Sequence, residues 1–167
     1  LDVMYHPETY SARYQYYFEK ILRNSLIQSD IIFSDTEASK NDLLGLFPHY
    51  ESKVVALPTG LSEEFIDFVD SSSKKNKRES TMLFVGSLSK KKNIAWLINT
   101  VITGIKSGAI PKLKLILVGN AGFGFNDIYN AMKDAKDIVV WKKNLSKKEL
   151  VETYLESDVV VLPSISE

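Results

Sequence analysis

The sequence predicts an α/β fold in which a parallel sheet is covered by helices on both faces. In the second half of the chain, four apolar runs have the unbroken character of buried parallel strands, and they lie at residues 81–85, 114–118, 138–141 and 158–162. Helical periodicity separates these runs, over residues 93–106, 126–135 and 147–156. In a sheet of this kind, ligands lie outside the carboxyl ends of the strands.

The first half of the chain predicts the order α-β-α-β. Residues 1–5 are interpreted as the tail of a strand and its loop, and a helix starts at His6-Pro7-Glu8. We expect the apolar face of this helix to pack in the core, and its members are Tyr14, Tyr17, Phe18, Ile21, Leu22 and Leu26. A substrate-facing role for one of these tyrosines is the lesser alternative.

Two short strands and a capped helix complete this half. Residues 31–33 and 53–57 have the strand pattern, and Ser34-Asp35-Thr36 can cap the helix between them. Phe47-Pro48 ends that helix. Because the beginning of such a layer is absent from the chain, its sheet edge would be open, and we expect self-association through the exposed cut edges.

These patterns divide the chain into three segments. Residues 1–68 are assigned to the C-terminal part of one domain, residues 69–80 to a linker, and residues 81–167 to a second, incomplete domain. The linker is polar and basic. We favour a solvated linker over a segment that contacts phosphates or an anionic membrane.

Composition excludes several classes of protein. The 167 residues are 44% hydrophobic, and 21 basic residues balance 21 acidic ones, so the net charge does not favour a nucleic acid partner. The absence of cysteine excludes disulfides, thiolate metal sites and a cysteine nucleophile. No apolar run has the length of a membrane span, and no secretory signal opens the chain. Because the chain runs from Leu1 to Glu167, directly after a strand-like run, we interpret it as a segment of a longer protein, truncated at both ends.

The loop Gly86–Asn93 is the strongest candidate site. An apolar strand stops at Gly86, three consecutive lysines follow, and a helical pattern begins at Ile94. This order places backbone N–H groups and a helix N-terminus at the carboxyl edge of the sheet, where an anion is favoured. Lys92 is best placed to reach a phosphate, whereas Lys90 and Lys91 could equally be solvated.

Other motifs are weaker or absent. The stretch 119–124 spells GxxGxG rather than the dinucleotide fingerprint, and no acidic residue ends the following strand, so a nicotinamide-dependent enzyme is rejected. The chain contains no P-loop sequence. Since neither His6 nor His49 is near an acidic cluster, we predict no metal site. The loops at residues 142–145 and 163–167 also follow predicted strands and complete the candidate edge.

In order and spacing, these motifs resemble those of the family 4 retaining glycosyltransferases of the GT-B fold. Residues 85–93 are similar to that family's VG-[RST]-L-xxx-KN segment, and residues 115–119 to its second strand and glycine. Its S-x-x-E-L…Y…AD-x-x-x-x-PS run is matched by Ser146, Glu149, Leu150, Tyr154, Asp158 and Pro163-Ser164, and Glu167 falls where its E-x7-E motif begins. Ser29–Thr36 and Pro58-Thr59-Gly60 resemble a strand of its N-terminal domain and its interdomain crossing.

The resemblance implies two Rossmann-like domains and a nucleotide-sugar donor held mainly by the C-terminal one, with no metal or other cofactor. The implied catalytic residues are Lys92, which would neutralise the donor diphosphate, and Glu167, which would lie near the transferred sugar. The loop after Trp141 would meet the base. The implied donor-binding residues are Gly86, Ser87, Lys91, Lys92, Asn93, Gly119, Lys142, Lys143, Leu145 and Ser166.

Three features depart from the family pattern. Ser87 replaces a common arginine, so Lys92, helped by Lys91, would carry the diphosphate. Lys143 stands where a glycine often follows the third strand. The chain ends at Glu167, before the second glutamate of the family motif, which would hold the ribose.

The implied function is transfer of a hexosyl unit from a UDP- or GDP-sugar to a glycan or a lipid-linked sugar acceptor. The implied setting is bacterial surface polysaccharide (LPS or capsule) biosynthesis in the cytoplasm, peripheral to the inner membrane. The alternative is a truncated, non-catalytic module for nucleotide binding or association. Binding of UDP or GDP together with donor turnover would distinguish the two.

Overall fold

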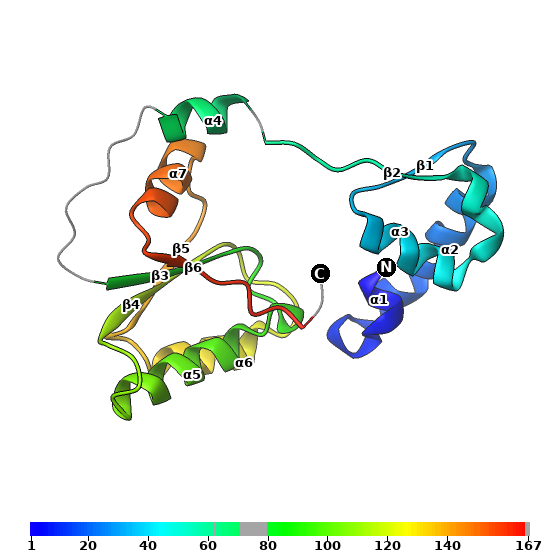
Figure 1. The fold of residues 1–167 in the computed structure, drawn as a ribbon. Helices are drawn as coiled ribbons and strands as arrows, with labels where there is room; N and C mark the ends of the chain where they lie inside the picture. Colours follow the sequence, from blue (N-terminus) through cyan, green and yellow to red (C-terminus); the bar gives the residue numbers. More distant parts are fainter. Residues whose placement is uncertain (62, 71–79, 166–167) are drawn as a thin grey trace. The chain divides into compact units, whose positions relative to one another are not determined.

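The structure is a computed structural model that describes residues 1–61, 63–70 and 80–165. It divides into two compact units, Leu1–Leu61 and Ser62–Glu167, whose elements are labelled in Figure 1. Both units combine helices with parallel strands. The predicted α/β fold class is therefore confirmed.

The first unit is a parallel pair of strands packed with helices. Its elements are α1 (Asp2–Tyr5), α2 (Ala12–Gln28), β1 (Ile32–Ser34), α3 (Glu37–Leu46) and β2 (Val54–Ala56), with 3₁₀ turns at Pro7–Thr9 and Pro48–Lys53. Ile32 is in register with Val54, and the Thr36 side chain caps α3 by accepting a hydrogen bond from the N–H of Ser39. The predicted order α-β-α-β is confirmed.

Two local predictions for the first unit are wrong. Residues 1–5 contain the helix α1 rather than the tail of a strand, because a short apolar run fits either structure. The helix expected from His6 is a 3₁₀ turn, and α2 begins only after Ser11, whose side chain accepts a hydrogen bond from the N–H of Tyr14. The serine cap, rather than the proline, therefore sets the start of the long helix.

The aromatic face of α2 lies largely on the surface of the first unit. Tyr14, Tyr17 and Ile21 are exposed by 49%, 50% and 62%. The core of the unit gathers elsewhere, around Leu26, Leu43, Phe47 and Val54. The prediction that this face packs in the core is therefore wrong for these three residues, because periodicity identifies an apolar face but not the element that covers it.

The second unit contains the sheet that carries the candidate site. Its described strands lie in the order β5-β4-β3-β6, and all neighbours are parallel. Its elements are α4 (Glu63–Asp70), β3 (Ser80–Val85), α5 (Ile94–Lys106), β4 (Leu113–Val118), α6 (Phe125–Lys133), β5 (Val139–Lys142), α7 (Lys147–Leu155) and β6 (Val159–Val160). Every strand and helix predicted between residues 81 and 162 is present.

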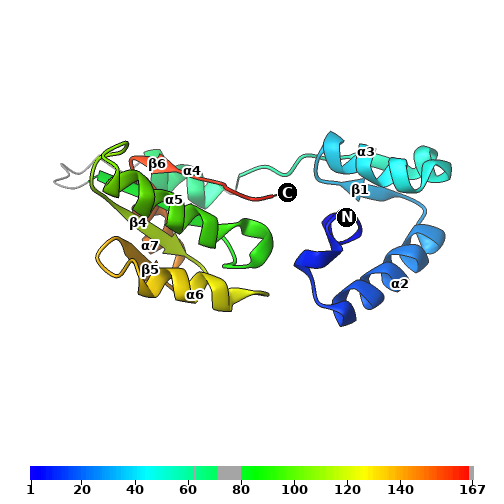
Figure 2. The same ribbon diagram turned by 90° about the horizontal axis from the view of Figure 1, so that it is seen from below.

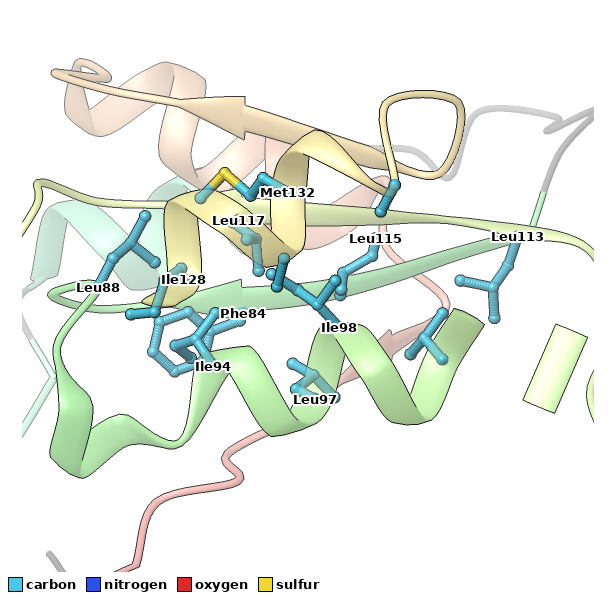
Figure 3. Packing of buried hydrophobic residues seen from close by; sticks show 13 residues of the cluster. Phe84, Leu88, Ile94, Leu97, Ile98, Leu113, Leu115, Leu117, Ile128 and Met132 are labelled. Carbon is cyan, nitrogen blue, oxygen red and sulfur yellow. The ribbon is translucent and has the colours of Figure 1, made fainter. Parts of the chain in front are cut away.

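Helices cover both faces of this sheet. Figures 1 and 2 show α5 and α6 side by side on one face, with α4 and α7 on the other. The main core lies between the sheet and the α5–α6 layer (Figure 3), and it includes Phe84, Leu88, Ile94, Leu97, Ile98, Leu113, Leu115, Leu117, Ile128 and Met132. Because β3 and β4 supply fully buried side chains, their carboxyl ends are held firmly.

The division between the units differs from the predicted domain boundary. It falls after Leu61, whereas the first domain was predicted to end at residue 68. The helix α4 packs in the second unit, where the ring of Phe65 meets that of Tyr154 edge-on, with centroids 6.1 Å apart. Most of the predicted linker, residues 71–79, lies outside the described residues. In the described part of the chain, no helix is both long and apolar enough to cross a membrane.

Candidate functional site

The loops after β3 and β4 are joined by backbone hydrogen bonds at the carboxyl edge of the sheet. The Gly86 N–H donates to the Val118 carbonyl at 2.9 Å, and the Leu88 N–H donates to the Asn120 carbonyl at 2.9 Å. Further along, the Lys90 N–H donates to the Phe123 carbonyl at 2.8 Å. The two glycine-containing loops, which the sequence predicts at one edge of the sheet, are therefore hydrogen-bonded to each other along their length.

The GxxGxG stretch allows this close approach. A β-carbon at Gly119, whose φ is +139°, would overlap the carbonyl oxygen of Gly86. A β-carbon at Gly122 would lie 2.9 Å from the β-carbon of Ser89, and one at Gly124 would lie 2.8 Å from that of Lys90. As a motif, these glycines gave only a weak cofactor signature in the sequence, although the resemblance implied donor binding for Gly119. Their contacts show that they pack the second loop against the first.

The three lysines form a 3₁₀ turn between two anchored residues. Leu88 before the turn and Ile94 after it are fully buried. Lys90 is exposed, while Lys91 and Lys92 are partly buried. The turn leads through Asn93 into α5, so Lys92 lies next to the N-cap of the helix. What Lys92 binds stays a prediction.

The helix start beside this turn has an unusual cap. Asn93 is the N-cap of α5 in the left-handed conformation, with φ of 55°, and its side chain makes no capping hydrogen bond. The N–H groups at the start of a helix attract an anion, and the helix dipole adds to this attraction. A lysine turn followed by a helix start without a side-chain cap therefore favours a phosphate group.

A third segment reaches the same turn from β6. The N–H of Ile165 donates to the carbonyl of Lys91 at 3.0 Å. The carboxyl ends of β3, β4 and β6 are thereby brought together, as the parallel sheet predicts. The candidate residues Ser166 and Glu167 lie outside the described residues.

Two consecutive lysines at the end of β5, Lys142 in the strand and Lys143 after it, lie on different sides of the sheet. The ammonium group of Lys142 lies 3.5 Å from the Thr153 hydroxyl on α7. Lys143 instead lies over the Trp141 ring, 3.6 Å from its centroid, on the α6 side. Side chains alternate along a strand, and this alternation is the signal that could have separated the two lysines. Leu145 is partly buried in the loop after β5.

The start of α7, beyond this loop, carries a capping box. The carboxylate of Glu149 accepts hydrogen bonds from the N–H and hydroxyl of Ser146, at 2.8 and 2.7 Å. These bonds lower the pKa of Glu149, and the charge of Lys142 lowers it further. Glu149 is therefore a structural carboxylate, as its predicted capping spacing indicates.

The described residues of this edge include no cluster of metal ligands. Among the described residues, no three His, Cys, Asp or Glu side chains gather in a way that could hold a metal ion. Lys90, Lys91 and Lys92 bring three positive charges to the loop after β3. The chemistry that these residues can supply is therefore electrostatic stabilisation of an anion.

Several solved structures have a similar fold. A mutant of S. aureus TarM in complex with Fondaparinux, α-GlcNAc-glycerol and UDP has a TM-score of 0.65 and 17% identity over 87% of this chain. Anabaena Alr3699/HepE in complex with UDP and glucose has a TM-score of 0.65 and 16% identity over 96% of this chain. A pneumococcal O-GlcNAc transferase, GtfA, with UDP and GlcNAc gives a TM-score of 0.59 and 21% identity over 88% of this chain.

This chain spans a minority of each of those proteins: 27% of the TarM and GtfA chains and 44% of the Anabaena chain. Comparison with curated proteins gives no match. The family described as Glycosyl transferases group 1 matches residues 65–167, which are more than half of the 167 residues and include all the loops of the candidate site. This protein therefore belongs to the glycosyl transferases group 1 family.

Proposed function

We propose that this chain is part of a family 4 retaining glycosyltransferase that moves a hexosyl unit from a UDP- or GDP-sugar to a glycan or lipid-linked sugar acceptor. UDP is bound in the structures of TarM, GtfA and the Anabaena protein, which supports a nucleotide-sugar donor. We further propose a role in bacterial surface polysaccharide (LPS or capsule) biosynthesis, with the enzyme in the cytoplasm and peripheral to the inner membrane.

The observation that carries this proposal is the lysine turn at the start of α5. The buried residues Leu88 and Ile94 hold the turn on either side, and the loop after β4 makes backbone hydrogen bonds with the loop that contains it. A diphosphate placed there would meet the ammonium of Lys92, assisted by Lys91, and the first N–H groups of the helix. Charge-assisted hydrogen bonds contribute about 1.5–3 kcal/mol each, and a helix terminus adds roughly 0.3–1 kcal/mol.

The same groups would serve the reaction. As the bond between the sugar and the diphosphate breaks, negative charge develops on the departing diphosphate. A positive group held in advance stabilises this charge without a large rearrangement. In the proposal, Lys92 has this role, Glu167 would lie near the transferred sugar, and no metal would be required.

Calorimetry with UDP and with GDP tests the donor site. We expect Lys92→Ala to weaken binding of the preferred nucleotide at least tenfold, or about 1.4 kcal/mol. Lys106→Ala is the matched control, because Lys106 is exposed in the last turn of the same helix. If the wild type and Lys92→Ala bind the nucleotide with equal affinity, Lys92 does not bind the diphosphate. If neither UDP nor GDP binds the wild type, the proposal of a donor site at this turn is wrong.

Donor turnover separates an enzyme from a binding module. In the proposal, a longer protein that contains this chain transfers or hydrolyses the donor sugar, and the 167-residue chain binds the nucleotide. A longer protein that binds the nucleotide but leaves the donor sugar intact would favour the non-catalytic alternative.

A further inference from the structure

The peptide unit that joins Lys91 to Lys92 is held at both of its polar groups. Its N–H, which belongs to Lys92, donates a hydrogen bond to the carbonyl of Ser89 at 3.0 Å. Its carbonyl, which belongs to Lys91, accepts a hydrogen bond from the N–H of Ile165, also at 3.0 Å. Because a peptide unit is planar, a bond at each of these groups fixes its orientation. The direction in which the chain continues at Lys92 therefore depends on both bonds.

The two bonds come from different parts of the chain. The bond from Lys92 to Ser89 lies within the lysine turn, and so does the bond from the N–H of Asn93 to the carbonyl of Lys90, at 3.1 Å. Ile165 instead belongs to the segment that follows β6, far along the sequence from the turn. The turn can therefore close by its own bonds, whereas the bond to its middle carbonyl is made from outside it.

The segment that makes this outer bond starts from the edge of the sheet. Val160 pairs with Leu83 of β3, and the N–H of Val161 donates to the carbonyl of Leu83 at 2.8 Å. Further along, the side chains of Leu162 and Ile165 are exposed by 69% and 53%. A segment that buries little apolar surface opens at a low cost in free energy. A bond made by such a segment should therefore respond to what the turn binds.

We infer that Ile165 is a positioning residue for the diphosphate, acting through its main-chain N–H on the peptide unit before Lys92. This inference rests on the proposed function, in which Lys92 meets the diphosphate. The bond from Ile165 favours the arrangement of the turn in which Lys92 lies beside the start of α5. Because coupling between two binding events is reciprocal, pyrophosphate and the Ile165 bond should stabilise each other by the same factor.

The first test compares the affinities of the wild type, Ile165→Pro and Ile165→Ala for inorganic pyrophosphate by calorimetry. Proline has no N–H, and loss of this one bond should weaken binding about three- to tenfold. Ile165→Ala is the matched control, because it keeps the N–H and shortens a side chain that is largely exposed. Its affinity should stay within about twofold of that of the wild type.

The second test needs no substitution. Amide hydrogen exchange followed by NMR measures how often the bond of the Ile165 N–H opens, with and without saturating pyrophosphate. We expect pyrophosphate to slow the exchange of this amide about three- to tenfold, which is the factor lost in Ile165→Pro. The amide of Val161 is the control, because it donates to the sheet rather than to the turn. Its exchange rate should change by less than about twofold.

The outcomes separate the inference from the proposed function. If Lys92→Ala weakens pyrophosphate binding and Ile165→Pro does not, the positioning role is overturned and the donor site stands. Equal losses in Ile165→Pro and Ile165→Ala would also overturn it, because the side chain rather than the N–H would then act. If Ile165→Pro does not fold, exchange of the Ile165 amide that pyrophosphate leaves unchanged overturns the inference. Absence of pyrophosphate and nucleotide binding in the wild type would overturn both.

Discussion

Replacing Gly119 with alanine tests whether the site depends on contact between two backbones. The added β-carbon would overlap the carbonyl oxygen of Gly86 and lie 2.8 Å from its carbonyl carbon. Both atoms belong to the main chain, so no side-chain rotation can relieve the contact. The loops after β3 and β4 must separate, or the φ of +139° at residue 119 must change.

The expected cost follows from the bonds at this point. Separation of the loops breaks the bond from Gly86 N–H to the Val118 carbonyl, and a change at Gly119 breaks its bond to the Lys142 carbonyl. Each is worth about 1 kcal/mol, and a positive φ costs alanine about 1–2 kcal/mol. Separation of the loops costs the bond between Gly86 and Val118 plus the strain of the positive φ, so we expect Gly119→Ala to lower the free energy of unfolding by about 2–3 kcal/mol.

Urea denaturation followed by tryptophan fluorescence measures this change. Both tryptophans, Trp96 and Trp141, lie in the second unit, so the signal reports that unit. Gly108→Ala is the control, because Gly108 also has a positive φ, of +74°, but no atom lies within 4 Å of its added β-carbon. We expect this variant to lose only the strain of about 1–2 kcal/mol. Equal losses in the two variants would refute the argument from backbone contact.

Two further predictions concern the core and the capping box. Leu88→Ala should lower the free energy of unfolding by about 2–5 kcal/mol in the same assay, because Leu88 is fully buried; Leu162→Ala, at a position 69% exposed, should change it little. The lowered pKa of Glu149 stabilises the fold above its ordinary pKa of 4.5, and this contribution is lost as the pH falls through the lower, folded-state pKa. Urea titrations at decreasing pH should therefore show a weaker acid dependence for Glu149→Gln than for the wild type, and identical pH curves would contradict the role of the capping box.

The second unit could be predicted closely from the sequence because its local signals agree. Buried parallel strands read as unbroken apolar runs, and the helices between them carry clear periodicity and, for α7, a capping box. The order of strands and helices then places the loops after β3 and β4 at one edge. The candidate turn at Lys90–Lys92 followed from this order together with the three consecutive lysines.

The first unit was less predictable because its signals are short. The apolar face of α2 was predicted to pack in the core, but Tyr14 and Tyr17 are half exposed in the structure. Nothing in a single sequence states which neighbour covers a helix face. The five residues before His6 fit a strand as well as a helix, and contacts within the unit decide between them.

The candidate site consists of a backbone framework, formed by the loops after β3 and β4, and of the lysines that it carries. The lysines can be recognised in the sequence more easily than the framework. The lysines are visible at once, since three in a row precede a helix. The framework depends on Gly119, Gly122 and Gly124, which allow close contact with the loop after β3. This role cannot be recognised until the contacted loop is known. A lysine variant should therefore lose ligand affinity without losing stability, whereas Gly119→Ala should lose both. This difference would show that the motif positions the phosphate site by its backbone, and that the lysines act on a surface already built.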